Sequence, residues 1–175
     1  MNTLTKRNEH YLKKCSFTGY RPQKMPFGFD ESDPRCVAFK AELRKTLEEL
    51  IGERYVYFLS GGSLGMDMFA AEAILELQKD YPWISLEVVT PFDAQAARWA
   101  PEYQERHDRL LEQADAVTPI CHEYTRSCMF RRNRYLVDEA DLLLAAFDGK
   151  PGGTAMTVEY ANRNKVPVKY IVPHA

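Results

Sequence analysis

Short apolar runs alternate with longer amphipathic segments along most of the chain. Six runs have the length and residue types of strands: Cys15–Thr18, Tyr55–Leu59, Leu86–Thr90, Ala116–Ile120, Leu142–Phe147 and Val168–Val172. Five segments between them have the spacing of helices with one buried face: Pro34–Ile51, Met66–Gln78, Glu102–Gln113, Met129–Glu139 and Thr154–Arg163. Asp33 and Pro34 supply a cap and a first-turn proline for the first helix, and Gly52 supplies a stop.

Strands that alternate with helices predict an α/β fold. Because each helix is long enough to cross over a sheet, the pattern favours a doubly wound, mostly parallel sheet of about six strands with helices on both faces. Ligands of such sheets bind beyond the carboxyl ends of the strands. We therefore expect ligand-binding and catalytic residues in the segments that directly follow a strand.

Length and charge narrow the classes of function. The 175 residues predict a polar lead over residues 1–14 and a single domain over residues 15–175. The net charge of −2 gives no global positive field, which argues against nucleic acid as a partner. The chain has no signal-like start and no apolar run of membrane-spanning length, and its four cysteines are predicted to be reduced, so we expect a cytoplasmic protein without a membrane partner.

A glycine-rich turn between the second strand and its helix is the sharpest candidate site. The segment runs from Ser60 through Gly61, Gly62, Ser63 and Gly65 to Asp67. Glycines there permit a close approach to a ligand, and the first helical turn favours an anion, so a phosphate cradle is predicted. Two alternatives stay open: a tight turn with Asp67 at the helix start, and a nucleophile elbow with Ser63 as nucleophile, for which His122 is the best-placed histidine.

Gly152, Gly153 and Thr154 form a second such turn after the fifth strand. Two glycine turns in one small sheet indicate a ligand with two polar ends, although a plain loop is the alternative for the second turn.

Basic and aromatic residues also follow strands. Among the arginines from Arg126 to Arg134, not all can point into one site, since Arg131 and Arg132 are about 100° apart on a helix. Asn133 adds an amide. After the first strand, Gly19 permits close approach, Tyr20 offers a ring for a base, and Arg21 offers an anion clamp. Phe92 and Trp99 are candidates for aromatic walls or for ordinary packing. The spacing of Cys121, His122 and Cys128 does not fit zinc, and no metal or cofactor is predicted.

These motifs together resemble the YpsA-like proteins of the SLOG superfamily. The segment Thr18-Gly19-Tyr20-Arg21-Pro22 is similar to the opening motif of that family, and the segment from Ser60 to Asp67 with Ala70-Ala71-Glu72 is similar to its second motif. Thr90-Pro91-Phe92 and Gly152-Gly153-Thr154 fit as well. The resemblance implies a Rossmann-like domain that binds a nucleotide or a nucleotide-derived ligand, and it brings Pro91 into the candidate site.

The LOG enzymes of the same superfamily imply a rival function. They remove the base from nucleoside 5′-monophosphates, and their catalytic arginine and glutamate correspond to Arg132 and Glu159. Asn133 stands where they have a lysine, and Ala155 and Met156 replace a glycine and a threonine. The DprA relatives imply a third function, the binding of single-stranded nucleic acid. The LOG relatives also imply a homodimer.

Overall fold

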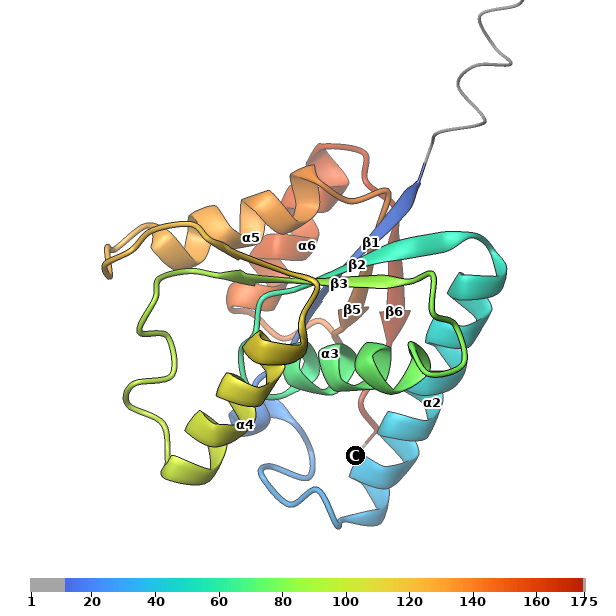
Figure 1. The fold of residues 1–175 in the computed structure, drawn as a ribbon, viewed down its shortest axis with the longest axis horizontal. Helices are drawn as coiled ribbons and strands as arrows, with labels where there is room; N and C mark the ends of the chain where they lie inside the picture. Colours follow the sequence, from blue (N-terminus) through green and yellow to red (C-terminus); the bar gives the residue numbers. More distant parts are fainter. Residues whose placement is uncertain (1–11, 175) are drawn as a thin grey trace, which may run out of the picture.

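The computed structural model describes residues 12–174 and contains one sheet of parallel strands (Figure 1). The strands are β1 (Lys13–Gly19), β2 (Tyr55–Ser60), β3 (Ser85–Thr90), β4 (Ala116–Pro119), β5 (Leu142–Ala146) and β6 (Val168–Ile171). Their order is β4-β3-β2-β1-β5-β6, and each neighbouring pair is parallel. The doubly wound α/β fold that the sequence predicts is confirmed, and the sheet is parallel throughout.

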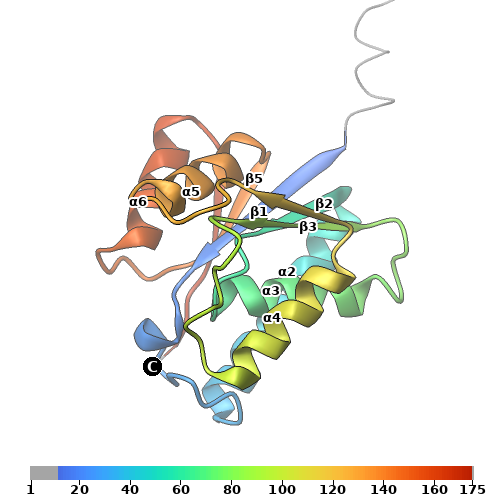
Figure 2. The same ribbon diagram turned by 60° about the vertical axis from the view of Figure 1, so that its left-hand side comes forward.

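Helices cover both faces of this sheet (Figure 2). One face carries α2 (Pro34–Gly52), α3 (Met66–Leu77) and α4 (Pro101–Gln113), and the other carries α5 (Cys128–Asp138) and α6 (Gly153–Arg163). A short 3-10 helix, η1 (Pro22–Lys24), follows β1. The element boundaries differ from the predicted ones by one or two residues, and the largest difference is at β1, which begins at Lys13 rather than at Cys15. None of the helices in residues 12–174 has the length and hydropathy that a membrane span requires.

The hydrophobic core is largest beneath α2, α3 and α4. Phe39, Leu43 and Leu47 of α2 are at most 4% exposed, and the Asp33 side chain accepts a hydrogen bond from the Arg35 amide at the start of this helix, as the sequence predicts. A smaller cluster lies beneath α5 and α6 on the other face. Because both faces are covered, β5 consists of buried apolar residues throughout.

The order of the strands reverses between β1 and β5. From β1 the chain proceeds to β2, β3 and β4 on one side, and then returns to pair β5 with the other edge of β1. The register places Gly19 of β1 beside Ala146 of β5, so the carboxyl ends of these two strands lie together. In doubly wound sheets this reversal opens a crevice in which ligands bind.

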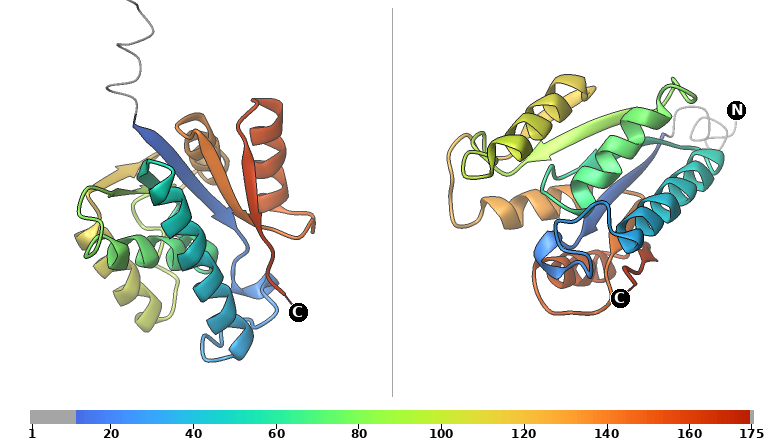
Figure 3. Two further views of the ribbon diagram at one scale, coloured as in Figure 1. Left: turned by 90° about the vertical axis from the view of Figure 1, so that its right-hand side faces the viewer. Right: turned by 90° about the horizontal axis from the view of Figure 1, so that it is seen from below.

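Charged residues fix the long loop between η1 and α2. Arg106 of α4 forms ion pairs with Glu31 of the loop and with Glu72 of α3, and Lys40 of α2 also pairs with Glu31. The segment after β6 runs past the start of α2, where Val172 and His174 share a cavity with Pro34 (Figure 3). The four cysteines, Cys15, Cys36, Cys121 and Cys128, are free in this structure.

Candidate functional site

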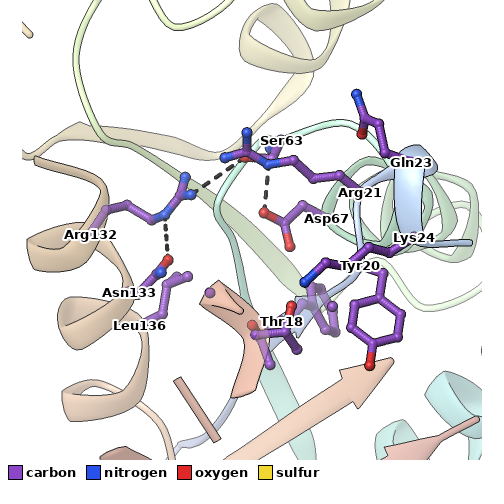
Figure 4. Close-up of a pocket in the computed structure, with 14 residues that line it drawn as sticks. Thr18, Tyr20, Arg21, Gln23, Lys24, Ser63, Asp67, Arg132, Asn133 and Leu136 are labelled. Atoms are coloured by element: carbon purple, nitrogen blue, oxygen red, sulfur yellow. Dashed lines mark hydrogen bonds between the residues drawn. The ribbon is translucent and has the colours of Figure 1, made fainter. Parts of the chain in front are cut away.

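A cavity of about 480 Å³ lies at the reversal point between β1 and β5 (Figure 4). Its walls come from the end of β1, the first glycine turn, α5 and the start of α6. The lining residues are Phe17, Thr18, Gly19, Tyr20, Arg21, Gln23, Lys24, Ser63, Asp67, Arg132, Asn133, Leu136, Gly153 and Thr154. Residues of both predicted glycine turns therefore contribute to a single cavity, together with Arg21 and Arg132.

Arg132 connects α5 to the first glycine turn. Its side chain is 3% exposed; Nη1 donates to the Gly61 carbonyl, Nη2 donates to Ser63 Oγ at 3.4 Å, and Nε donates to Asn133 Oδ1 at 3.0 Å. Asp67 lies at the start of α3, and its carboxylate accepts a hydrogen bond from the Ser63 amide at 3.4 Å. Arg132 thus holds the turn in place from one side while Asp67 holds it from the other.

Four charged side chains line the cavity: Arg21, Lys24, Asp67 and Arg132. Burial raises the pKa of the Asp67 carboxyl, while the charges of Arg132 and Arg21 act in the opposite direction. Burial also lowers the pKa of Arg132, against the favourable charge of Asp67. Arg21 approaches Ser63 and Asp67 from the side opposite Arg132 (Figure 4). The site consequently combines two guanidinium groups and one ammonium group with one carboxylate, and this combination suits an anion that also carries hydroxyl groups.

The glycines of the first turn make room for groups of the protein itself. Gly65 has φ +86, and a side chain there would meet the Tyr20 carbonyl. A Cβ atom at Gly61 would lie 2.7 Å from Arg132 Nη1 and 2.7 Å from Asp67 Oδ2. These two glycines therefore allow close packing within the protein, and neither is among the residues that line the cavity.

Ser60 and Gly62 also lie outside the cavity lining. The Ser60 hydroxyl is fully buried, donates to the Asp67 carbonyl at 2.8 Å and accepts from the Gly62 amide at 3.2 Å. Their contribution is to shape the turn that presents Ser63 and Asp67, since those two residues alone of the turn face the cavity.

The second glycine turn faces the cavity through Gly153 and Thr154. Gly152 caps α6, whose first turn contains no acidic residue. Lys24 of η1 reaches this turn and donates from Nζ to the Pro151 carbonyl at 2.6 Å. The helix N-terminus and the Lys24 ammonium place positive potential on this wall. Lys24 was not predicted, although it comes only two residues after the Thr18–Pro22 motif.

Tyr20 has a different role from the predicted one. Its ring is 2% exposed and packs against Phe147 at 5.9 Å between centroids, so it presents no open face to a base. The hydroxyl donates to Asp148 Oδ1 at 2.5 Å and accepts from the Lys150 amide at 3.0 Å. That hydrogen bond holds the pKa of Asp148 below its usual range. Tyr20 therefore anchors the turn after β5 to the end of β1.

Glu159 and Pro91 lie away from the cavity. The Glu159 side chain is 65% exposed and pairs with Arg163 at 3.0 Å, one turn along α6. Pro91 is buried, and its carbonyl accepts from the Cys121 amide at 3.1 Å. The sequence places Glu159 on the helix that opens the site, but the rotation of α6 turns it toward solvent, so the structure does not bring it together with Arg132.

The other arginines of the basic run stay outside as well. Arg131 donates to Cys121 Sγ at 3.1 Å, and Arg134 stacks over Phe130 at 4.2 Å. Within residues 12–174 no group of three or more His, Cys, Asp or Glu side chains is arranged to hold a metal ion.

Ser63 lacks the partner of a hydrolase nucleophile. Its Oγ accepts from Arg132 and from Gln95 Nε2 at 3.3 Å. His122 pairs with Asp93 at 3.1 Å, and its side chain is 84% exposed. His107 contacts Gln95 at 3.1 Å rather than Ser63 itself. Within residues 12–174 no histidine ring bonds to the Ser63 hydroxyl, so this part of the chain does not form the serine–histidine pair of a nucleophile elbow.

Comparison with known proteins identifies relatives that match most of the chain. The family model YpsA, described as the YspA SLOG family, matches residues 15–175. A UPF0398 protein of Bacillus pumilus is 35% identical over 164 residues, which cover 91% of this chain and 88% of that protein. A UPF0398 protein of Bacillus thuringiensis is 32% identical over 155 residues, which cover 87% of this chain and 84% of that protein.

Two solved structures share the fold. DNA processing protein A from Helicobacter pylori, described with a single-stranded DNA binding mode, has a TM-score of 0.61 at 15% identity and covers 91% of this chain and 65% of its own. The protein of that name from Streptococcus pneumoniae has a TM-score of 0.64 at 15% identity, and the match covers 94% of this chain and 51% of that structure. The chain thus spans about two thirds and about half of the lengths of these two structures.

Proposed function

The chain belongs to the YpsA family of SLOG proteins, and from this premise we propose that its cavity between β1 and β5 binds a nucleotide or a nucleotide-derived ligand. The observation that carries the proposal is the grouping of Arg21, Arg132 and the buried Asp67 in one cavity, with the N-terminus of α6 on the opposite wall. In a site for inorganic phosphate alone, a buried carboxylate would weaken binding, because a carboxylate repels anions.

The charged groups suit different parts of such a ligand. Arg21 and Lys24, with the amide groups at the start of α6, would bind a phosphate, since charge-assisted hydrogen bonds to phosphate oxygens are strong. When ionised, the Asp67 carboxylate only accepts hydrogen bonds, so it would accept them from ribose hydroxyls. Arg132 would act mainly by holding the turn that carries Ser63 and Asp67.

Replacing Arg21 by alanine should weaken binding about tenfold or more, because a hydrogen bond to a charged group contributes about 1.5–3 kcal/mol. Arg21 is exposed, so the fold should be kept. Isothermal titration with AMP, ADP-ribose and NAD measures the effect. Arg163→Ala is the matched control, because it removes the same charge from an exposed site outside the cavity. Equal titration curves for the two variants would exclude Arg21 from the site.

Replacing Glu159 by glutamine should leave the affinity for AMP unchanged within about twofold, because Glu159 does not line the cavity. The fold should also be kept, because exposed ion pairs contribute little to stability. In the structure Glu159 is exposed to solvent and forms an ion pair with Arg163. Chromatography of AMP incubated with each protein tests the rival hydrolase function. Release of adenine by the wild type and not by Glu159→Gln would support hydrolysis and oppose a pure binding function.

Single-stranded nucleic acid is the second candidate ligand. It is favoured by the fold shared with the Helicobacter pylori protein and by aromatic side chains close to Arg21. The net charge of −2 opposes it. Fluorescence anisotropy with a labelled oligothymidylate distinguishes the two: tight, strongly salt-dependent binding would favour nucleic acid, and its absence would favour the nucleotide.

A further inference from the structure

A second cavity, of about 580 Å³, adjoins the first. Arg21, Gln23 and Ser63 line both cavities, so the two spaces share a wall. Five of the ten other residues that line the second cavity are aromatic, and we call this space the aromatic cavity. The rings are Phe29, Phe92, Trp99, Tyr103 and Tyr124.

These rings come from four separate parts of the chain. Phe29 lies in the loop before α2, Phe92 and Trp99 lie between β3 and α4, Tyr103 lies on α4, and Tyr124 lies between β4 and α5. The loops that carry them extend from the same end of the sheet (Figure 2). The fold therefore gathers rings that the sequence keeps far apart.

The rings form pairs across segments; Phe29 and Tyr124 are exposed, and the other three are partly buried. Phe29 and Tyr103 lie 5.8 Å apart, and Phe92 and Tyr124 meet edge to face at 5.4 Å. Phe29 is 47% exposed and Tyr124 is 65% exposed. Neither ring is needed to fill the core, since large buried side chains already fill it beneath α2 and α3. Exposed rings around a cavity offer flat surfaces on which another ring can stack.

The two cavities have complementary chemistry across their shared wall. The first contains most of the charged and hydroxyl groups, whereas the second adds five rings to a lining that also contains Gln95 and Arg98; Arg21 lies at the boundary. We propose that the aromatic cavity binds the planar heteroaromatic ring of the same ligand whose phosphate and ribose occupy the first cavity. This inference rests on the proposed function and defines the ligand class further: an anion and a planar ring in one molecule. It also assigns the stacking role to rings other than Tyr20.

Three probes separate the contributions of the two cavities. AMP carries the ring and the anion, ribose 5-phosphate carries only the anion, and adenosine lacks the anion. If the ring stacks in the aromatic cavity, AMP should bind about tenfold or more tightly than ribose 5-phosphate, because stacking of one base on aromatic side chains is of that size. Adenosine should bind more weakly than AMP because it leaves Arg21 without a phosphate.

Trp99 provides a direct signal from the aromatic cavity. The chain has two tryptophans, and Trp83 is 59% exposed outside both cavities. In a Trp83→Phe background, fluorescence therefore reports on Trp99 alone. AMP should change this fluorescence, and ribose 5-phosphate at saturation should change it far less. In the same background, Tyr124→Ala should weaken AMP binding about fivefold or more without altering the affinity for ribose 5-phosphate. Tyr170→Ala is the control, because Tyr170 is also exposed but lies on β6.

The outcomes distinguish this inference from the proposed function. Tighter binding of AMP, a Trp99 signal and a selective loss in Tyr124→Ala would support it. Equal affinity for AMP and ribose 5-phosphate would overturn the inference and leave the proposed function intact. AMP binding without a Trp99 signal and without an effect of Tyr124→Ala would also overturn it, because the ring would then lie elsewhere. Binding of none of the three probes would overturn both.

Discussion

Replacing Arg132 by methionine should lower the free energy of unfolding by about 3–5 kcal/mol, the range expected when one partner of a buried charge pair is removed. Methionine keeps most of the apolar length, so the loss comes from the guanidinium. Its removal takes away the larger of the two guanidinium charges that act on the buried Asp67, and it takes donors from the Gly61 carbonyl and the Ser63 hydroxyl. Urea unfolding followed by circular dichroism measures the change.

The loss in Arg132→Met should depend on pH. Burial already raises the pKa of Asp67, and without the charge of Arg132 this pKa rises further. The folded protein then binds a proton more readily than the unfolded chain, so stability falls as pH rises from about 4, the ordinary value for aspartate, through the folded pKa. The deficit should consequently be smaller at low pH than at neutral pH.

Two further variants make the assignment specific. Adding Asp67→Asn to Arg132→Met should recover part of the stability, because it removes the buried charge. Arg131→Met is the matched control and should change stability by no more than about 0.5 kcal/mol, because Arg131 is exposed. A pH-independent deficit that Asp67→Asn fails to reduce would show that the charge pair does not carry the effect.

Replacing Gly65 by alanine should destabilise the protein by about 3 kcal/mol, combining a strained backbone with overpacking. Gly65 has φ +86, and the added Cβ would meet the Tyr20 carbonyl, a backbone group that cannot rotate away. Met66 donates from its amide to the same carbonyl at 3.2 Å, so the clash separates α3 from the end of β1. Because these elements form two walls of the first cavity, affinity for AMP should fall as well.

Gly149→Ala separates the two causes. Gly149 has φ +102, but nothing lies within 4 Å of the Cβ position. The Gly149→Ala variant should therefore lose only the stability that the strained backbone costs, about 1–2 kcal/mol. Equal losses of stability for the two variants in thermal or urea unfolding would show that the Tyr20 carbonyl moves to accommodate the added Cβ, so that close packing at Gly65 is unimportant.

Periodicity was sufficient to predict the elements of this fold. The α2 stripe of Phe39, Leu43 and Leu47 is buried as its spacing requires, and β5 is apolar because helices cover it on both sides. The start of β1 was missed because Lys13 and Lys14 are polar, yet both belong to the strand and pair with β2. Local pattern identifies a strand by its apolar residues, whereas backbone pairing decides where it begins.

The candidate site was predicted less completely, since its contacts depend on how elements rotate and approach. Helical spacing showed that Arg131 and Arg132 face different directions, but it did not show which one is buried. The resemblance to the LOG enzymes placed Glu159 in the site, whereas α6 turns its side chain outward. The aromatic cavity depends on loops that meet only in the folded chain. Phe92 and Trp99 were the two of its rings that proximity to a strand end could identify.

The central place of β1 has a consequence for biosynthesis. This strand emerges early from the ribosome and can pair with β2 soon afterwards, but its other edge pairs with Leu142–Ala146, which is translated much later. Until then the nascent polypeptide exposes an unpaired edge of its innermost strand, and open strand edges promote aggregation. Products of premature termination before Leu142 would keep that edge permanently, which makes them natural clients for chaperones or proteases.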